Sequence, residues 1–235
     1  MKKIRSLILW ISGGTVFFFS MNIILICTYF FKEETYDPVV KVLLKAILRA
    51  CGIKVKVEGL ENIDENKTYL YMANHVNIFD IPILGAYLPR SIRGIEAEEQ
   101  FKWPLFGWVI TRAGNIPINR EDPRLAIKAI NRGIERLKNG KSLVILPEGH
   151  RTLDGNLREF KKLPFKMAKR SGVDLVPLAL CNLFEIKHKG SWIINPGTVT
   201  LKIGKPISKE KINSMTPEEL RDYVKEIIQK MLEEK

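Results

Sequence analysis

The chain begins with a long run of apolar residues. Residues 6–31 contain no charged side chain, and Lys2, Lys3 and Arg5 precede them. A membrane-spanning helix needs about 20 apolar residues, so this run is long enough to cross a bilayer. A cleaved signal peptide is the alternative, but the run is longer than a usual signal core and its end has no small-residue cleavage site. The pattern therefore favours a retained membrane anchor.

The residues before the apolar run and the residues within it both bear on which side of the membrane the globular part occupies. The basic residues before the run favour a cytoplasmic amino terminus, and a single crossing would then place the globular part outside. Gly13, Gly14 and Asn22 lie within the run and favour a break or bend in the helix. A helical hairpin in one leaflet would keep both ends on the same side. On this hypothesis we expect the globular part on the cytoplasmic face of the cell membrane.

A second amphipathic segment, residues 37–51, follows the apolar run. Lys41, Lys45 and Arg49 recur every four residues beside a broad apolar face. Such a helix suits a membrane interface. The same pattern fits a core helix with a solvated basic edge, and the sequence does not separate the two. We expect residues 1–51 to form membrane-anchoring helices.

The remainder, residues 52–235, alternates short apolar runs with amphipathic stretches. The runs that predict strands are residues 53–57, 68–73, 91–97, 115–118, 142–146, 174–180 and 199–203. Asp122-Pro123 predicts the start of one helix, and Thr216 with Glu219 forms a capping box at the start of another. Strands that alternate with helices indicate an α/β domain, with a layered mixed sheet flanked by helices.

Composition narrows the possible partners. The formal net charge of +12 would attract nucleic acid, anionic lipid or a phosphorylated substrate. The sequence contains no aromatic-and-basic motif of the kind that binds nucleic acid, so with an anchor present anionic lipid is the simpler partner. Cys27, Cys51 and Cys181 have no paired spacing, and the three histidines have no metal-ligand spacing. Neither a disulfide framework nor a metal site is indicated.

The first candidate for chemistry is His75, followed five residues later by Asp80. A histidine can take a proton from a hydroxyl near neutral pH, and a carboxylate on its other ring nitrogen orients it. On one helix these residues would point about 140° apart, so a pair requires His75 in a strand-to-helix turn and Asp80 in the first helical turn. No Gly-x-Ser-x-Gly nucleophile elbow accompanies them, so a substrate would supply the hydroxyl. The alternative is a structural histidine with a capping aspartate.

Further polar groups follow the buried run at residues 142–146. The exit of a central strand in an α/β sheet is where ligands usually bind. Glu148 is suited to a substrate hydroxyl, Gly149 to close backbone approach, and Arg151 to a phosphate. Pro-Glu-Gly is also good turn chemistry, and Arg151 could be a surface base. Arg120, after the run at residues 115–118, is either a ligand or a surface ion-pair partner.

Taken together, four segments resemble the sequence blocks of the glycerolipid acyltransferase family, in order and in spacing. They are residues 74–80, 114–120, 146–151 and 176–180. The resemblance extends from Val57 to Ile207, includes residues 103–108, and is greatest to the branch that acylates 1-acyl-glycerol-3-phosphate. Some positions depart from the family pattern and bear on substrate detail: Pro117, Leu146, His150 and Leu163.

The resemblance implies a reaction and a role for each candidate residue. An acyl group would pass from a thioester, on coenzyme A or acyl carrier protein, to the free 2-hydroxyl of 1-acyl-glycerol-3-phosphate, a membrane lipid. The product is phosphatidic acid, a phospholipid precursor, and neither a cofactor nor a metal is required. His75 would be the general base held by Asp80, Arg120 and Arg151 would hold the acceptor phosphate, and Glu148 would position glycerol oxygens. An apolar groove must accept the donor chain.

Three alternatives remain from the sequence. The same chemistry could act on glycerol 3-phosphate or on another lysophospholipid. An esterase or thioesterase would use the histidine to activate water. A non-enzymatic, membrane-anchored binder of anionic lipid would bind vesicles without turnover.

Overall fold

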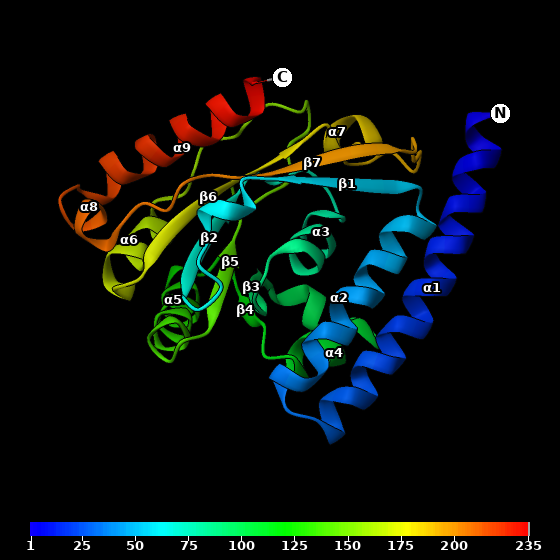
Figure 1. Cartoon of the computed structure of the whole chain (residues 1–235), viewed down its shortest axis with the longest axis horizontal. Helices are drawn as coiled ribbons and strands as arrows, with labels where there is room; N and C mark the ends of the chain where they lie inside the picture. The colour runs from blue at the N-terminus through cyan, green and yellow to red at the C-terminus, as the bar shows by residue number, and fades with distance from the viewer. Residues whose placement is uncertain (235) are drawn as a thin grey trace.

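A seven-stranded sheet forms the centre of the molecule, and the computed structural model describes residues 1–234 (Figure 1). The strands are β1 (Ile53–Glu58), β2 (Tyr69–Ala73), β3 (Ile92–Ala97), β4 (Ile116–Ile118), β5 (Ser142–Ile145), β6 (Asp174–Cys181) and β7 (Gly197–Ile203). Their order is β1-β7-β6-β2-β5-β3-β4, and only β6 and β7 pair antiparallel. The predicted mixed α/β sheet is confirmed, and each predicted strand lies within two residues of its observed bounds.

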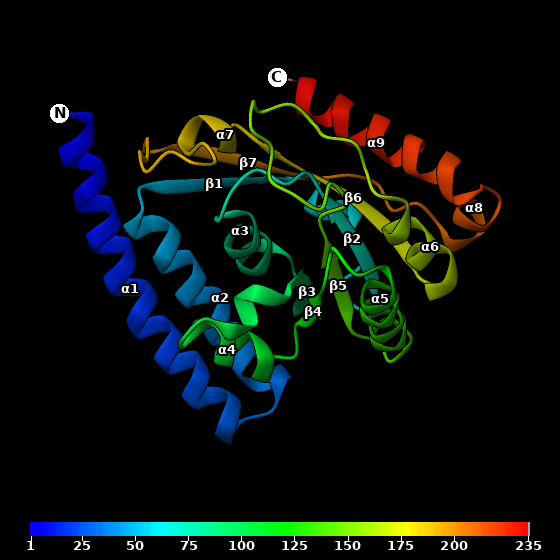
Figure 2. The same ribbon diagram turned by 180° about the vertical axis from the view of Figure 1, so that it is seen from behind.

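Helices cover both faces of this sheet (Figures 1 and 2). They are α1 (Lys2–Phe30), α2 (Glu33–Ala50), α3 (Asp80–Tyr87), α4 (Phe106–Arg112), α5 (Pro123–Lys138), α6 (Lys162–Ser171), α7 (Leu183–Ile186), α8 (Lys209–Asn213) and α9 (Pro217–Glu233), with short 3₁₀ turns η1 (Leu60–Asn62) and η2 (Glu98–Lys102). The helices α1 to α4 lie on one side, whereas α5, α6, α8 and α9 lie on the other.

Strand β2 shows why the sheet is buried on both sides. Tyr69, Tyr71 and Ala73 belong to the core beneath α3, while the alternate residues Leu70 and Met72 belong to the core beneath α5, α6 and α9. Side chains of a strand alternate between faces, so a strand covered on both sides must be apolar throughout. Burying one such large side chain stabilises the fold by about 1.5–3 kcal/mol.

Helix starts follow the local signals in the sequence. The Asp122 carboxylate accepts hydrogen bonds from the backbone N–H groups of Arg124 (2.8 Å) and Leu125 (3.3 Å) at the start of α5. At the start of α9, Thr216 and Glu219 exchange side-chain and backbone hydrogen bonds in a capping box. Both predicted starts are confirmed. Such caps satisfy N–H groups that have no partner inside the helix.

The apolar run forms one continuous helix, so the break predicted within it is wrong. The helix α1 passes through Gly13, Gly14 and Asn22 without interruption. The Asn22 side chain donates back to the Phe18 carbonyl (2.8 Å) and remains within the helix. A Cβ on Gly13 would lie 2.3 Å from the Cys51 Sγ, so this glycine permits close packing against the end of α2. The chain reverses after α1, and α2 returns alongside it (Figure 1).

The second amphipathic segment is α2, which packs against α1 and α3. Its buried Asp37 faces Arg93 of β3, with 3.2 Å between Oδ1 and Nη2. The Lys45 ammonium lies over the Tyr87 ring at the end of α3. Lys41 donates a hydrogen bond to the Pro89 carbonyl, just beyond that helix. Two of the three basic residues in the stripe, Lys41 and Lys45, therefore lie against the end of α3 and the residues just after it.

Candidate active site

His75 and Asp80 form a close pair where β2 gives way to α3. The Nδ1 atom of His75 lies 2.6 Å from Oδ2 of Asp80. His75 follows the end of β2, and Asp80 is the first residue of α3, which is the arrangement that their spacing required. With Nδ1 against a carboxylate, the favoured neutral tautomer carries its proton there and leaves Nε2 free to accept another.

The Asp80 carboxylate is fixed by the turn itself. This residue is fully buried, and besides His75 it accepts hydrogen bonds from the backbone N–H groups of Val76 (2.8 Å) and Asn77 (3.0 Å). All three groups that face it are N–H donors, as an ionised carboxylate requires. The carboxylate also sits at the start of α3, where the helix dipole favours negative charge. The imidazole is therefore held by a rigid partner.

Two asparagines tie this turn to the end of β6 and to the segment that follows it. The Asn74 side chain accepts from the Leu180 N–H (2.8 Å) and donates to the carbonyl of the same residue (3.3 Å). The Asn77 amide donates to the carbonyls of Leu183 (3.1 Å) and Lys187 (2.8 Å). Neither asparagine is among the site residues predicted from the sequence. The available signal was two asparagines flanking a histidine at a strand exit, where buried backbone needs partners.

Glu148, predicted from the sequence to position a substrate hydroxyl, is buried and has both carboxylate oxygens on backbone N–H groups. One carboxylate oxygen accepts the backbone N–H of His75 (2.6 Å), and the other accepts that of Arg158 (3.0 Å). The residue is only 3 % exposed. Burial raises the pKa of Glu148 to about 7, while the two backbone hydrogen bonds act in the opposite direction. This carboxylate therefore supports the His75 backbone.

The neighbouring residues complete that support. The Thr152 backbone N–H donates to the His75 carbonyl (2.9 Å), so the segment after β5 holds His75 at both its N–H and its C=O. Gly149 has φ of +73°, a left-handed conformation that favours glycine, and its N–H closes a turn on the Leu146 carbonyl (3.0 Å). Gly149 thus shapes the turn that carries Glu148.

The two candidate arginines lie at the same edge of the sheet as His75. Arg120 follows β4 and Arg151 follows β5, and the strands β2, β4 and β5 all run in the same direction. Burial lowers the pKa of Arg120, and the positive charge of Arg151 contributes to this. His150, next to Arg151 in the chain, also has a lowered pKa, first because of burial and then because of the charge of Arg120. This edge therefore carries concentrated positive charge suited to an anion.

Lys187 adds a third cation that the sequence analysis missed. The residue is 7 % exposed, and its Nζ donates to the carbonyls of His188 (3.1 Å) and Ser191 (2.7 Å). Burial lowers the pKa of Lys187, and the charge of Arg151 lowers it further. A single lysine in a loop carries no sequence signal, because only the fold brings it near β5.

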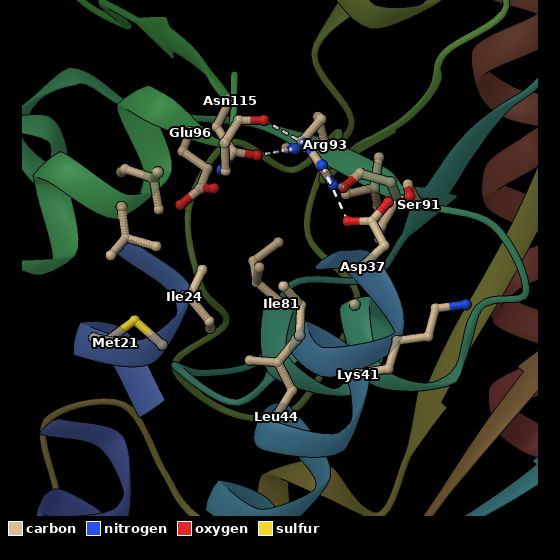
Figure 3. A pocket seen from close by; sticks show the side chains of 18 of the residues that line it. Met21, Ile24, Asp37, Lys41, Leu44, Ile81, Ser91, Arg93, Glu96 and Asn115 are labelled. Carbon is tan, nitrogen blue, oxygen red and sulfur yellow. Dashed lines mark hydrogen bonds and ion pairs between the residues drawn. The ribbon is translucent and has the colours of Figure 1, made fainter. Parts of the chain in front are cut away.

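An apolar cavity of about 120 Å³ lies behind α3 (Figure 3). Its apolar walls are residues of α1, α2, α3, α4 and β5: Met21, Ile24, Val40, Leu44, Ile81, Phe106, Val109, Ile110 and Val144. Glu96 lies on one side and the Arg93–Asp37 ion pair on the other (Figure 3). Burial raises the pKa of Glu96 to about 7, and its Oε1 has no hydrogen-bond partner within residues 1–234.

Comparison with known proteins gives consistent matches. A family model described as Acyltransferase matches residues 54–181. A chloroplastic 1-acyl-sn-glycerol-3-phosphate acyltransferase of Arabidopsis thaliana is 37 % identical over 70 % of this chain and 47 % of its own length. The enzyme of that name from Borreliella burgdorferi is 32 % identical over 81 % and 76 %. The chain thus spans about half the length of the plant chloroplast relatives it matches.

The likeness extends to the whole fold. The crystal structure of the 1-acyl-sn-glycerophosphate acyltransferase from Thermotoga maritima superposes with a TM-score of 0.87 at 28 % sequence identity. The match covers 99 % of this chain and 97 % of that one, including the helices that precede the sheet.

Proposed function

We propose that this chain, which belongs to the acyltransferase family, transfers a fatty acyl group from an acyl thioester to the 2-hydroxyl of 1-acyl-glycerol-3-phosphate. The product would be phosphatidic acid. The observation that carries the proposal is the His75–Asp80 pair, which leaves a ring nitrogen free at the sheet edge that also bears Arg120 and Arg151. A base and an anion site in one place suit an acceptor that has both a hydroxyl and a phosphate.

In this mechanism the acceptor hydroxyl is the nucleophile. His75 Nε2 takes its proton as the oxygen attacks the thioester carbonyl, and Asp80 stabilises the imidazolium that forms. The tetrahedral intermediate then collapses, the C–S bond breaks, and the thiolate recovers the proton from His75. General base assistance of this kind contributes about 10²- to 10⁴-fold. No covalent intermediate with the enzyme is required.

Arg120 and Arg151 would hold the acceptor phosphate. A guanidinium binds phosphate oxygens through paired N–H donors, and such charge-assisted bonds are stronger than neutral ones. Burial lowers the pKa of Arg120 and the charge of Arg151 lowers it further, and a bound phosphate would offset both effects. Because the phosphate and the 2-hydroxyl belong to the same small glycerol unit, anchoring one orients the other toward His75.

Glu148 and Asn77 serve as positioning residues in this proposal. Neither needs to touch the substrate, because each binds backbone groups around His75 and Lys187. Their effect is to hold the imidazole at one angle in the turn. A base must be held close to its reaction geometry, since small displacements reduce the rate strongly.

The helix α1 supports placement at a membrane. Within residues 1–234 it is the one helix long and apolar enough to cross a bilayer, and most of its surface is exposed. Trp108 of α4 and the nearby Trp103 are exposed, and α4 packs against α1. Tryptophan is enriched at membrane interfaces. The start of α1 hydrogen-bonds to the globular part, from Ser6 to the Ile194 carbonyl (3.2 Å) and from Trp10 to the Trp192 carbonyl (2.6 Å). We therefore propose that the basic amino terminus and the globular part lie on the same side, and that α1 holds the protein at the cytoplasmic face, where the lysolipid acceptor resides.

The apolar cavity behind α3 is our candidate for the donor's acyl chain. It lies next to the helix that begins with Asp80, and Ile81 of that helix forms part of its wall. Apolar lining favours a hydrocarbon chain, because burial removes its surface from water.

Product analysis tests the proposal. Purified protein in vesicles, supplied with 1-acyl-glycerol-3-phosphate and either acyl-coenzyme A or acyl carrier protein thioester, should yield phosphatidic acid by mass spectrometry. Acylation of glycerol 3-phosphate or of a lysolipid with a larger headgroup instead would revise the acceptor. Free fatty acid without acceptor would indicate a thioesterase, and vesicle binding without product would indicate a lipid binder.

A further inference from the structure

A groove of about 360 Å³ separates α5 from α6 on the face of the sheet opposite α1. Its lining residues are Ile127, Ile130, Leu163, Lys166, Lys169, Arg170 and Pro217. Ile127, on the groove side of α5, is 47 % exposed, although it lies outside the proposed acyl-transfer site. A large apolar side chain therefore stands in water in a groove that has both apolar and basic lining residues.

Positive charge borders these apolar residues. Arg124 and Lys128 lie on α5 and Lys166 lies on α6, and all three are exposed. In the part of the chain that the structure describes, none of them forms an ion pair within 4.0 Å. The nearby Glu218 is already paired with Lys162 (3.2 Å). An apolar centre with a charged rim is the usual anatomy of a protein interface.

The groove begins beside the proposed active site. The helix α5 starts three residues after Arg120, and the Lys161 N–H just before α6 donates to the Pro147 carbonyl (2.8 Å). Ile127 is the fifth residue of α5, so it lies about 6 Å along the axis from the helix start. A partner seated in the groove would thus have one end close to the segment that carries Glu148 and Arg151.

The groove faces away from the bilayer that holds α1, so that bilayer cannot be what binds in the groove. The helices α5 and α6 lie across the sheet from α1 and α2, on the far side of the molecule (Figures 1 and 2). The partner must therefore approach from the aqueous side and carry negative charge with some apolar surface. The proposed reaction already needs one such delivery, because its thioester donor has to reach a membrane-held site.

We propose that the α5–α6 groove docks an acidic acyl carrier protein, whose thioester-bearing arm reaches His75 around the edge of the sheet. The proposal rests on the proposed function. Negative side chains of the carrier would face Arg124, Lys128 and Lys166, and its apolar residues would cover Ile127 and Leu163. Complementary charge raises the rate of encounter and selects the partner. Coenzyme A would reach the site directly and would not need the groove.

Reversing the charge of lysines at the groove should affect acyl transfer from acyl carrier protein but not from acyl-coenzyme A. The double variant Lys128→Glu/Lys166→Glu changes one lysine that lines the groove, Lys166, and one next to Ile127 in the chain, Lys128. The control of equal net charge, Lys138→Glu/Lys205→Glu, changes two lysines that neither line the groove nor neighbour a lining residue in the chain. Acyl transfer to 1-acyl-glycerol-3-phosphate is measured with each donor, at low and at high salt. With acyl carrier protein, kcat/KM of the groove variant should fall at least tenfold through KM, with a smaller loss at high salt. With acyl-coenzyme A it should stay within twofold of wild type, as should the control with both donors.

A direct binding measurement tests the docking proposal separately from the proposed catalytic function. Fluorescence anisotropy of labelled acyl carrier protein measures docking whether or not acyl transfer occurs, and an Ile127→Ala variant tests the apolar contact. Binding that weakens at least tenfold in the groove variant alone supports the proposal. Wild-type protein that does not bind the carrier, equal binding by groove and control variants, or equal loss with both donors would each overturn it. Failure of turnover with both donors alongside groove-specific binding would refute the function and leave the docking surface.

Discussion

A carboxylate oxygen of Glu148 accepts a hydrogen bond from the backbone N–H of His75, with 2.6 Å between the two atoms. The two residues are 73 positions apart in the chain. The contact joins the segment after β5 to the turn after β2, so two neighbouring strands jointly hold the imidazole. Glu148 and the turn at Gly149, predicted from the sequence to contact the substrate, thus contribute to the support of His75.

Replacing Glu148 by Gln should lower kcat. The amide NH₂ would face one of the two backbone N–H groups that the carboxylate now satisfies, and an unsatisfied buried donor costs about 1–3 kcal/mol. If that cost disturbs the His75 turn, kcat falls by about 10- to 100-fold. The KM for the acceptor should stay within about twofold of wild type, since Glu148 is buried away from it. Steady-state kinetics in mixed micelles measures both, and a raised KM with normal kcat would instead indicate a substrate contact.

Glu96 should make stability fall as the pH rises. Burial raises its pKa from 4.5 to about 7, so between these values the folded state holds a proton that the unfolded state releases. Its stabilising contribution is complete below pH 4.5 and is lost as the pH passes 7. Glu96→Gln mimics the neutral form, so the variant should gain on the order of 1–3 kcal/mol relative to wild type between pH 5 and pH 8.

Thermal unfolding in detergent, followed by circular dichroism at several pH values, measures this difference. The exposed Glu61→Gln provides the control, and its difference from wild type should not change with pH. If the stability difference between Glu96→Gln and wild type is also independent of pH, the pKa of Glu96 is not raised by burial.

Arg151→Ala and Arg120→Ala should weaken binding of the phosphorylated acceptor. Loss of a charge-assisted hydrogen bond costs about 1.5–3 kcal/mol, which raises the acceptor KM by about 10- to 100-fold. A 1-acylglycerol without phosphate serves as the comparison acceptor. The variants should lose the preference for the phosphorylated acceptor, whereas equal losses with both acceptors would show that these arginines do not hold phosphate.

The exposed face of α1 should control membrane binding. Phe18 and Phe19 are 56 % and 61 % exposed, and burying each in a bilayer contributes about 1.5–3 kcal/mol. Phe18→Glu/Phe19→Glu should therefore reduce sedimentation with vesicles of phosphatidylglycerol and phosphatidylcholine by at least tenfold. Leu60→Glu, an exposed apolar residue in η1, is the control and should bind as wild type does. Full vesicle binding by the double phenylalanine variant would contradict the role given to α1.

The sequence predicted the features whose partners are local. Asp122 and Thr216 mark helix starts because their side chains bind backbone within three residues. His75 and Asp80 meet because a strand-to-helix turn is the one arrangement that brings that spacing together. The strands follow from apolar runs that a buried sheet requires.

Features that depend on distant partners were not predictable. Gly13 and Gly14 suggested a broken helix, but the fold places Cys51 against Gly13, so the glycine serves close packing instead. Glu148 has a backbone donor 73 residues away, and Asn77 has an acceptor 110 residues away at Lys187. A single sequence identifies the polar residues at a strand exit but not which buried group each of them satisfies.

Acyl transfer by this site requires His75 as the base. The most direct test is the rate of phosphatidic acid formation by His75→Ala, measured by product mass spectrometry with 1-acyl-glycerol-3-phosphate and a donor that wild-type protein uses. We expect a rate lower by about 10²- to 10⁴-fold, with acceptor binding largely retained. A His75→Ala variant that forms phosphatidic acid at the wild-type rate would contradict this role of His75.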